Sequence, residues 1–342
     1  MRLFYRGYEL PFEYPFTISK GTKTHQPTLV VALEFRGLVG YGEAPAISYY
    51  NVTVDSMIAE LEAKRVLVEK YAFTEPERYW HYLHHLFPKN NFLVCALDMA
   101  YWDLYAKSKR KPLYRFFTDS LDAAPLTDYT IGIADIESMI SKVDRKPWPI
   151  YKVKLGTPAD LQVVMELRKH TEGLIRVDAN AGWTSDQANE LIPKLQSLGV
   201  EFIEQPLATG DRDGMKSLFE SSQSIFIADE SCVQEKDVDG CVGLFHGVNI
   251  KLTKCGGITP TIRMIKKARE LGLKVMLGSM NESTIGSAAI VHLSGLIDYM
   301  DCDGPLLLSE DIASGLRYEN GRVQVSDEPG LGVRMFDDIA SV

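Results

Sequence analysis

Residues 174–206 read LIRVDANAGWTSDQANELIPKLQSLGVEFIEQP and contain a strand, a helix and a second strand. The two ends, 174–178 and 200–204, are short apolar runs of strand length. Between them Thr184 and Gln187 form a capping box, apolar residues follow at helical spacing, and Gly199 marks the end of the helix. This unit predicts two parallel strands joined by a crossover helix.

The same alternation continues on both sides of this unit. Further candidate strands are residues 129–133, 150–155, 224–228, 247–251, 274–278 and 298–301. Another helix is expected to have Thr259 as its N-cap and Pro260 as its first residue, and to end at Gly272. Eight strands alternating with helices indicate a closed parallel barrel or a doubly wound sheet. Because no GxGxxG motif follows a strand, a dinucleotide-binding fold is disfavoured.

The first 122 residues are organised differently. Residues 2–8 alternate as in a strand, 28–44 predict two strands joined at Arg36-Gly37, and helical patterns follow at about 53–71, 75–86 and 91–108. The last of these is apolar almost all round, which predicts a buried helix. The chain therefore divides into an α+β domain (1–122), a barrel (123–304) and a tail (305–342). The tail has a hairpin signal at Asn320-Gly321 and is expected to pack on the first domain.

Composition limits the classes of function. The 342 residues are 45% hydrophobic and 24% charged, as is typical of globular proteins. With 37 basic and 46 acidic residues the net charge is −9, which argues against nucleic acid as a partner but leaves room for a small anionic substrate. We see no signal peptide and no apolar run of the roughly 18 residues that a membrane span needs. Five scattered cysteines predict buried, reduced thiols, so we expect a cytoplasmic protein. The sequence does not decide between a monomer and a homo-oligomer.

Charged and polar residues interrupt the apolar runs near the carboxyl ends of six predicted strands. They are Lys152 and Lys154, Asp178 and Asn180, Glu204, Asp229 and Glu230, Lys251, and Asp301 and Asp303. From Lys154 through Asp178, Glu204 and Asp229 to Lys251 the steps are 24, 26, 25 and 22 residues, one strand–helix unit each. The same height is therefore sampled on successive strands, at the end of a barrel where active sites lie.

The predicted ring of strands suggests what this set can do, although each residue alone is more often a turn former or a cap. The strands that carry Asp178, Glu204 and Asp229 are neighbours, and three carboxylates suit Mg²⁺. Lys154 and Lys251 lie four strands apart and face each other. Two bases on opposite sides of a carbon allow a proton to leave one face and return on the other. The pattern favours a racemase or an epimerase.

At these residues the sequence resembles the enolase superfamily, in its muconate-lactonizing branch. The matching motifs are Lys152-Val-Lys154, Asp178-Ala-Asn180, Glu204-Gln-Pro206, Asp229-Glu230-Ser231 and Ile250 to Ile258, and the resemblance covers essentially the whole chain. It implies an α/β fold: a (β/α)7β TIM-like barrel with an N-terminal α+β capping domain that the C-terminal tail completes. Members of this superfamily use a Lys or His base with Mg²⁺.

The resemblance also implies a role for each residue. Asp178, Glu204 and Asp229 would hold one Mg²⁺ per subunit, and Lys154 and Lys251 would be the acid/base pair. Lys152 would stabilise the charge on the substrate carboxylate and its ene-diolate. Asn180 and Glu230 would support the metal ligands from behind.

Asp301 and Asp303 distinguish between reactions within the branch. They resemble the pair with which dipeptide epimerases hold the α-ammonium of the substrate, and two carboxylates on one face of a strand form a cation site. Ser279 and Met280, with Thr130, would line the same pocket. Other readings remain: one aspartate could cap the turn at Gly304, and the protein could be a cycloisomerase, an o-succinylbenzoate synthase, an N-acylamino acid racemase or a non-catalytic barrel that binds a ligand.

Two capping segments, near residues 15–27 and 48–54, are expected to set specificity. Members that act on Ala-Glu place an arginine in the first segment, but this chain has Lys20 and Lys23 there and no arginine. We therefore expect an L-Ala-X dipeptide in which X is small or hydrophobic. The residues behind this expectation are Phe16, Ile18, Ile47, Tyr49 and Tyr50.

Overall fold

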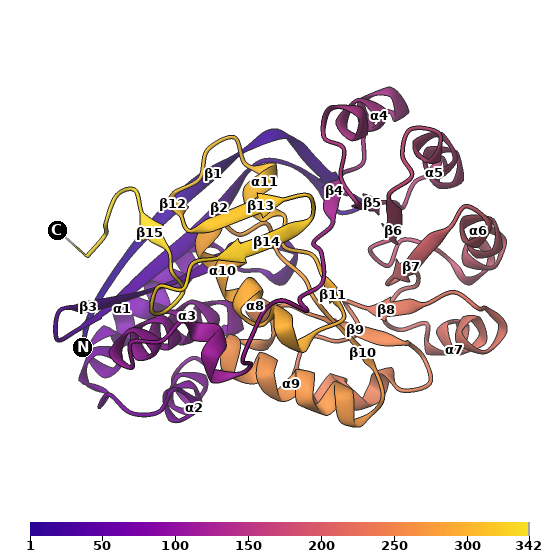
Figure 1. Cartoon of the computed structure of the whole chain (residues 1–342). Helices are drawn as coiled ribbons and strands as arrows, with labels where there is room; N and C mark the ends of the chain where they lie inside the picture. The colour runs from indigo at the N-terminus through magenta and orange to yellow at the C-terminus, as the bar shows by residue number, and fades with distance from the viewer. Residues whose placement is uncertain (341–342) are drawn as a thin grey trace.

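The structure, a computed structural model, describes residues 1–340 and consists of a capping domain packed against a barrel (Figure 1). The capping domain opens with an antiparallel sheet in the order β1-β2-β3. Its elements are β1 (Arg2–Ile18), β2 (Gly21–Phe35), β3 (Leu38–Pro45), α1 (Val54–Lys70), α2 (Pro76–Leu86) and α3 (Asn91–Ser108). The turn at Arg36-Gly37 and the three predicted helices are confirmed.

Helix α3 is buried on all sides, as its composition predicts. One side packs across β3, where a Cβ on Gly42 would lie 2.0 Å from the carbonyl oxygen of Ala96. Only glycine permits this close approach of strand and helix. The other side of α3 faces the barrel helices α8 (Leu252–Cys255) and α9 (Ile258–Glu270).

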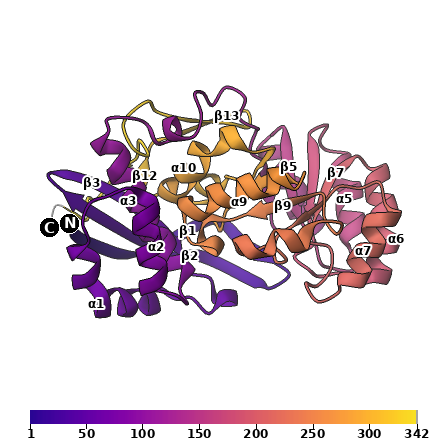
Figure 2. The ribbon, with the colours of Figure 1, turned by 90° about the horizontal axis from the view of Figure 1, so that it is seen from below.

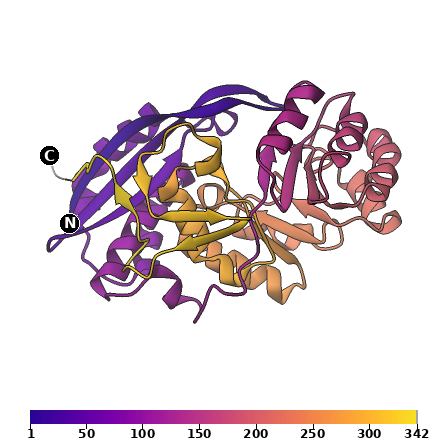
Figure 3. The same cartoon turned by 45° about the horizontal axis from the view of Figure 1, so that its top comes forward.

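Strand β1 is much longer than the alternation at residues 2–8 predicts. It pairs with β2 out to Ile18↔Gly21, with an irregularity in register between Pro11 and Phe16. The irregularity breaks the alternating pattern, so the sequence signal ends early although the backbone pairing resumes. The resulting hairpin extends beyond the capping domain and reaches over the barrel (Figure 3).

The barrel contains all eight predicted strands in consecutive order around the sheet. They are β4 (Tyr129–Ile131), β5 (Ile150–Lys154), β6 (Leu174–Asp178), β7 (Val200–Glu204), β8 (Phe226–Ala228), β9 (Gly247–Ile250), β10 (Lys274–Leu277) and β11 (Tyr299–Met300). A parallel bridge between Thr127 and Met300 joins the two edges. The doubly wound alternative is wrong, because such a sheet reverses its strand order.

Helices connect the strands and cover the outside of the barrel. Besides α8 and α9 they are α4 (Ile136–Arg145), α5 (Asp160–Arg168), α6 (Ser185–Ser197), α7 (Arg212–Ser221) and α10 (Thr284–His292). In Figure 2, α5, α6 and α7 lie at the end of the molecule away from the capping domain, whereas α9 and α10 lie beside it. The capping box of Thr184 and Gln187 begins α6 as predicted. Within residues 1–340 no helix is both long enough and apolar enough to span a membrane.

The predicted start of α9 is wrong. Its N-cap is Gly257, and Thr259 lies inside the first turn. The carboxylate of Asp98, on α3 of the capping domain, accepts hydrogen bonds from the Thr259 amide (2.9 Å) and hydroxyl (2.8 Å). Because the carboxylate of Asp98 from the other domain accepts the free backbone N–H at the start of the helix, Thr259 has no capping role.

The tail contains α11 (Gly304–Leu307), β12 (Ala313–Ser314), β13 (Leu316–Glu319), β14 (Arg322–Val325) and β15 (Arg334–Met335). The hairpin at Asn320-Gly321 forms as predicted, but β14 packs on the barrel helix α10 (Figure 1). Later residues reach the capping domain: the Leu331 amide donates to Asp103 (2.8 Å), and Tyr41 donates to Asp338 (2.8 Å). The tail thus joins the two domains instead of lying on the first alone.

Candidate active site

Three acidic side chains meet at the carboxyl ends of adjacent barrel strands. Asp178 is the last residue of β6 and pairs in register with Glu204, the last residue of β7, while Asp229 directly follows β8. All three are buried, and one carboxylate oxygen of each lies within 4.8 Å of the others. Oxygen ligands in this number suit a hard divalent cation, so the residues fit Mg²⁺.

The electrostatics of the trio also favour a bound cation. Burial raises the pKa of Glu204 to about 7, and the charge of Asp178 adds to this effect. Burial acts in the same sense on Asp178 and Asp229, but nearby lysines outweigh it and hold both pKa values below their usual range. A cation at the centre of the trio would stabilise the ionised form of Glu204 as well.

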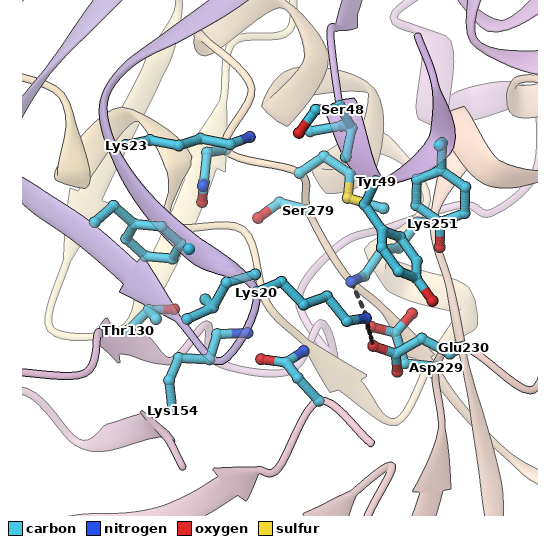
Figure 4. Close-up of a pocket in the computed structure, with 18 of the residues that line it drawn as sticks. Lys20, Lys23, Ser48, Tyr49, Thr130, Lys154, Asp229, Glu230, Lys251 and Ser279 are labelled. Carbon is cyan, nitrogen blue, oxygen red and sulfur yellow. Dashed lines mark hydrogen bonds and ion pairs between the residues drawn. The ribbon is translucent and has the colours of Figure 1, made fainter. Parts of the chain in front are cut away.

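The three predicted lysines contact this trio from different directions. Lys154 Nζ lies 2.6 Å from Asp178 Oδ2, and Lys251 Nζ lies 2.7 Å from Asp229 Oδ2. Both line the cavity and come from opposite sides of it (Figure 4). This arrangement follows from the strand order, which places β5 four steps from β9.

Lys152 is fully buried beneath the cavity. Its Nζ lies 2.7 Å from both Glu204 Oε2 and Asp301 Oδ2, and 3.7 Å from Asp178 Oδ2. Burial alone would lower the pKa of Lys152, but the charges of Asp301 and Glu204 raise it well above its usual value. Lys152 is therefore a fixed positive charge.

A cavity of about 200 Å³ lies between the barrel and the capping domain (Figure 4). The barrel contributes Thr130, Lys154, Asn180, Asp229, Glu230, Lys251, Ser279, Met280 and Asp301 to its lining, and the capping domain contributes Phe16, Ile18, Lys20, Lys23, Ile47, Ser48, Tyr49 and Tyr50. Most of the first capping segment is strand, because β1 and β2 pair almost to the tip of the hairpin. The second forms a short 3-10 turn over Ser48–Tyr50.

Asp301 and Asp303 follow β11. Within residues 1–340, the Oδ1 atoms of both are buried and accept no hydrogen bond. Asp301 lines the cavity, while Asp303 Oδ2 accepts from the Thr130 amide (2.6 Å). Burial raises the pKa of Asp303 to about 7, with Asp301 contributing. The side chain of Asp303 does not cap α11, so the turn-capping reading does not describe it.

The two predicted supporting residues differ. The backbone amide of Asn180 donates to Asp178 Oδ1 (2.8 Å), so Asn180 does contact a proposed ligand. Glu230 instead pairs with Lys20 at the hairpin tip, at 2.6 Å, and the Lys20 ammonium lies 3.8 Å from the ring centre of Tyr49.

Two further residues contact the trio and were missed in the sequence. Asn249 Nδ2 donates to Glu204 Oε1 (2.7 Å), and Lys254 Nζ donates to Asp229 Oδ1 (2.6 Å). Asn249 is a polar residue within the apolar run of β9, and this interruption could have identified it as a candidate site residue. Lys254 follows the strand within the Lys251–Gly257 motif, but only the fold shows that α8 turns its side chain toward Asp229.

Comparisons with known proteins agree with this architecture. Residues 3–117 match the family of mandelate racemase and muconate lactonizing enzyme N-terminal domains, and residues 135–339 match the enolase C-terminal domain-like family. A protein from Flavobacterium johnsoniae, named L-Ala-D/L-amino acid epimerase, is 47% identical over 98% of this chain and 100% of its own length. A hydrophobic dipeptide epimerase from a Flavobacteria bacterium is 34% identical over 99% of both chains.

Solved structures show the same similarity. The L-Ala-D/L-Glu epimerase of Bacillus subtilis, in a substrate complex, superposes with a TM-score of 0.92 at 27% identity, over 97% of this chain and 98% of that one. The dipeptide epimerase of Cytophaga hutchinsonii, complexed with Mg and D-Ala-L-Val, gives 0.91 at 25% identity, over 99% and 97%. Since both domains match their families over nearly their whole lengths, this chain belongs to the enolase superfamily.

Proposed function

We propose that this protein is a Mg²⁺-dependent dipeptide epimerase. It inverts the α-carbon of the C-terminal residue of an L-Ala-X dipeptide. The observation that carries the proposal is one cavity with Lys154 and Lys251 on opposite sides. Asp229 of the carboxylate trio and Asp301 also line it, and both Asp301 and the neighbouring Asp303 have a buried Oδ1 atom that accepts no hydrogen bond among the described residues.

The two charged groups of a dipeptide match two sets of acidic side chains, the metal trio and the pair of Asp301 and Asp303. One Mg²⁺ per subunit, held by Asp178, Glu204 and Asp229, would stabilise the negative charge that develops on the substrate carboxylate. The fixed cation of Lys152 beneath adds to this stabilisation. The free Oδ1 atoms of Asp301 and Asp303 are suited to accept hydrogen bonds from the α-ammonium group.

The proton moves between the substrate and two lysines. One lysine, as a neutral amine, takes the α-proton and becomes an ammonium, while the electron pair of the broken C–H bond passes into the ene-diolate of the substrate. The lysine on the opposite face, as an ammonium, then donates a proton to the same carbon. Lys154 and Lys251 exchange roles for the two stereoisomers, and the reaction needs no oxidant and no other reactant.

The capping domain favours a small or hydrophobic second residue. Phe16, Ile18, Ile47 and Tyr50 give the cavity an apolar wall. Of the two lysines in the hairpin, Lys20 is paired with Glu230 and Lys23 is hydrogen-bonded to Gln26 (3.1 Å). The name of one relative, hydrophobic dipeptide epimerase, agrees with this choice, and the name L-Ala-D/L-amino acid epimerase agrees with an L-Ala-X substrate.

Other reactions of the branch fit the cavity less well. Cycloisomerisation, o-succinylbenzoate synthesis and racemisation of N-acylamino acids involve no free ammonium group. They would leave the buried Oδ1 atoms of Asp301 and Asp303 without a hydrogen-bond donor, which is costly. A non-catalytic binding protein would need neither lysine at its position. We further propose a cytoplasmic setting, where the unpaired cysteines remain reduced.

Incubation of the protein with Mg²⁺ and a library of L-Ala-L-X dipeptides in D₂O tests the proposal. We expect deuterium at the α-carbon of X and formation of the L-Ala-D-X product, both lost on addition of EDTA. NMR measures the exchange and chiral chromatography measures the product. Absence of deuterium from every dipeptide would refute the epimerase assignment.

A further inference from the structure

We propose that Lys254 is a positioning residue that fixes Asp229 as a metal ligand. The inference rests on the proposed function, because it assumes that Asp229 holds Mg²⁺. Lys254 lies in α8, three residues beyond Lys251, and its side chain is fully buried. It lies behind Asp229 and away from the cavity, so it acts through that carboxylate and does not touch the substrate.

The Lys254 ammonium is surrounded by oxygen atoms of two segments. Its Nζ lies 2.6 Å from Asp229 Oδ1, 2.7 Å from the Asp229 carbonyl, 3.0 Å from the Cys232 carbonyl and 3.3 Å from the Asn249 carbonyl. An ammonium group has three N–H donors, so this environment satisfies all of them. The same group thus holds the side chain and the backbone of Asp229 together.

Asp229 needs this support more than the other two carboxylates do. Asp178 and Glu204 are strand residues that face each other in the ladder, whereas β8 ends at Ala228 and Asp229 lies beyond it. The amide of Asp229 is held by Gln205 Oε1 (3.1 Å), and its carbonyl by Lys254. The ammonium therefore replaces the hydrogen bonds that a longer strand would provide.

The two oxygens of Asp229 are divided between two lysines. Lys254 binds Oδ1 from behind, and Lys251 binds Oδ2 from the cavity side. With Oδ1 fixed, Oδ2 is directed toward the trio and toward the proposed base. Without Lys254, Oδ1 and three carbonyl oxygens lose a charged donor, and of the two lysine contacts the carboxylate keeps only that of Lys251 to Oδ2. The neighbouring supports, Asn180 and Asn249, are neutral, so Lys254 is the charged one among these three.

The test measures Mg²⁺ binding to the full-length Lys254→Met variant by isothermal titration calorimetry. We expect a 10- to 100-fold weaker Kd for Mg²⁺, because loss of a partner behind a metal ligand has effects of about this size. The matched control is Lys107→Met, which removes an ion pair outside the site, with the buried Asp103 in the capping domain (2.8 Å). It should lower the melting temperature and leave the Kd for Mg²⁺ unchanged.

A double-mutant comparison separates positioning from general stability. If Lys254 acts through Asp229, then Lys254→Met should weaken Mg²⁺ binding in the wild-type background. The same substitution should leave the Kd for Mg²⁺ unchanged in the Asp229→Asn background. Should the methionine variant fail to fold, Lys254→Gln replaces it in both backgrounds. An unchanged Kd in folded Lys254 variants overturns the inference and leaves the epimerase proposal standing. Failure of the wild-type protein to bind Mg²⁺ would instead count against the proposed function.

Discussion

The barrel rim differs from the capping surface, which consists of the residues in segments 16–23 and 47–50 that line the cavity. The two regions differ in how their side chains are held. On the rim, Lys152, Lys154, Asp178, Glu204, Asp229 and Lys251 are all buried and joined by ion pairs of 2.6 to 2.7 Å. The capping surface is mainly apolar, and the Lys20–Glu230 pair ties the tip of its hairpin to the rim. The rim is suited to proton transfer at the α-carbon, which is the same for every dipeptide. The capping surface is suited to selecting the side chain of the residue that is inverted.

The largest expected effect comes from removing a carboxylate on the rim. Glu204→Gln keeps the shape of the side chain and its contact with Asn249, but removes a negative charge from the proposed metal site. We expect epimerisation to fall by about 10³-fold and calorimetric Mg²⁺ binding to weaken in parallel. If turnover stayed near the wild-type rate, the trio would not be the metal site.

The aspartates at β11 should affect binding more than turnover. For Asp303→Asn we expect KM for L-Ala-L-X to rise by about 100-fold, the usual scale for removing one partner of a buried charge pair. Steady-state kinetics on the free and the N-acetylated dipeptide provide the check. The N-acetylated form has no ammonium group, so its already poor kcat/KM should not change. Equal losses for both forms would contradict the assigned partner.

A change in the capping surface should alter selectivity only. Ile18→Ala removes part of the apolar wall, and we expect about a 10-fold loss of kcat/KM for L-Ala-L-Leu with little change for L-Ala-L-Ala. The Kd for Mg²⁺ should be the same as in the wild type. A variant that lost activity equally for every dipeptide would show that the wall also shapes the rim, and the division between the two regions would be wrong.

The smallest effect on catalysis is expected at the contact between the capping domain and α9, away from both regions. Burial raises the pKa of Asp98, which caps α9, from 3.8 to about 7. The folded protein therefore keeps a proton that the unfolded chain releases, so stability falls as pH rises from about 4 to 7. Asp98→Asn cannot ionise and should reduce this decline. Urea denaturation at pH 5 and pH 8 measures it, and an unchanged difference between the two midpoints would contradict the role of Asp98.

The barrel and its charged residues could be predicted because their signals are local and periodic. Each strand is a short apolar run, each strand end carries its polar residue, and one strand–helix unit separates the members of the set. Asp178, Glu204 and Asp229 converge as this periodicity predicts. A parallel barrel leaves little freedom once its strands are placed.

Contacts between distant segments could not be predicted in this way. The start of α9 depends on Asp98, 161 residues away from Thr259 in the sequence. The length of β1 depends on its pairing with β2 beyond an irregular register. Lys254 is an ordinary helical lysine by sequence, and its contact with Asp229 depends on how the fold places α8 beside the end of β8.

Isotope exchange at the α-carbon tests the central claim, that Lys154 and Lys251 act on opposite faces of the substrate. Lys154→Ala and Lys251→Ala are each incubated in D₂O with Mg²⁺ and, separately, with L-Ala-L-X and L-Ala-D-X. We predict that neither variant epimerises, that each still exchanges the α-proton of one stereoisomer, and that the two variants retain opposite stereoisomers. Exchange of the same stereoisomer by both variants, or epimerisation by either, would contradict the account.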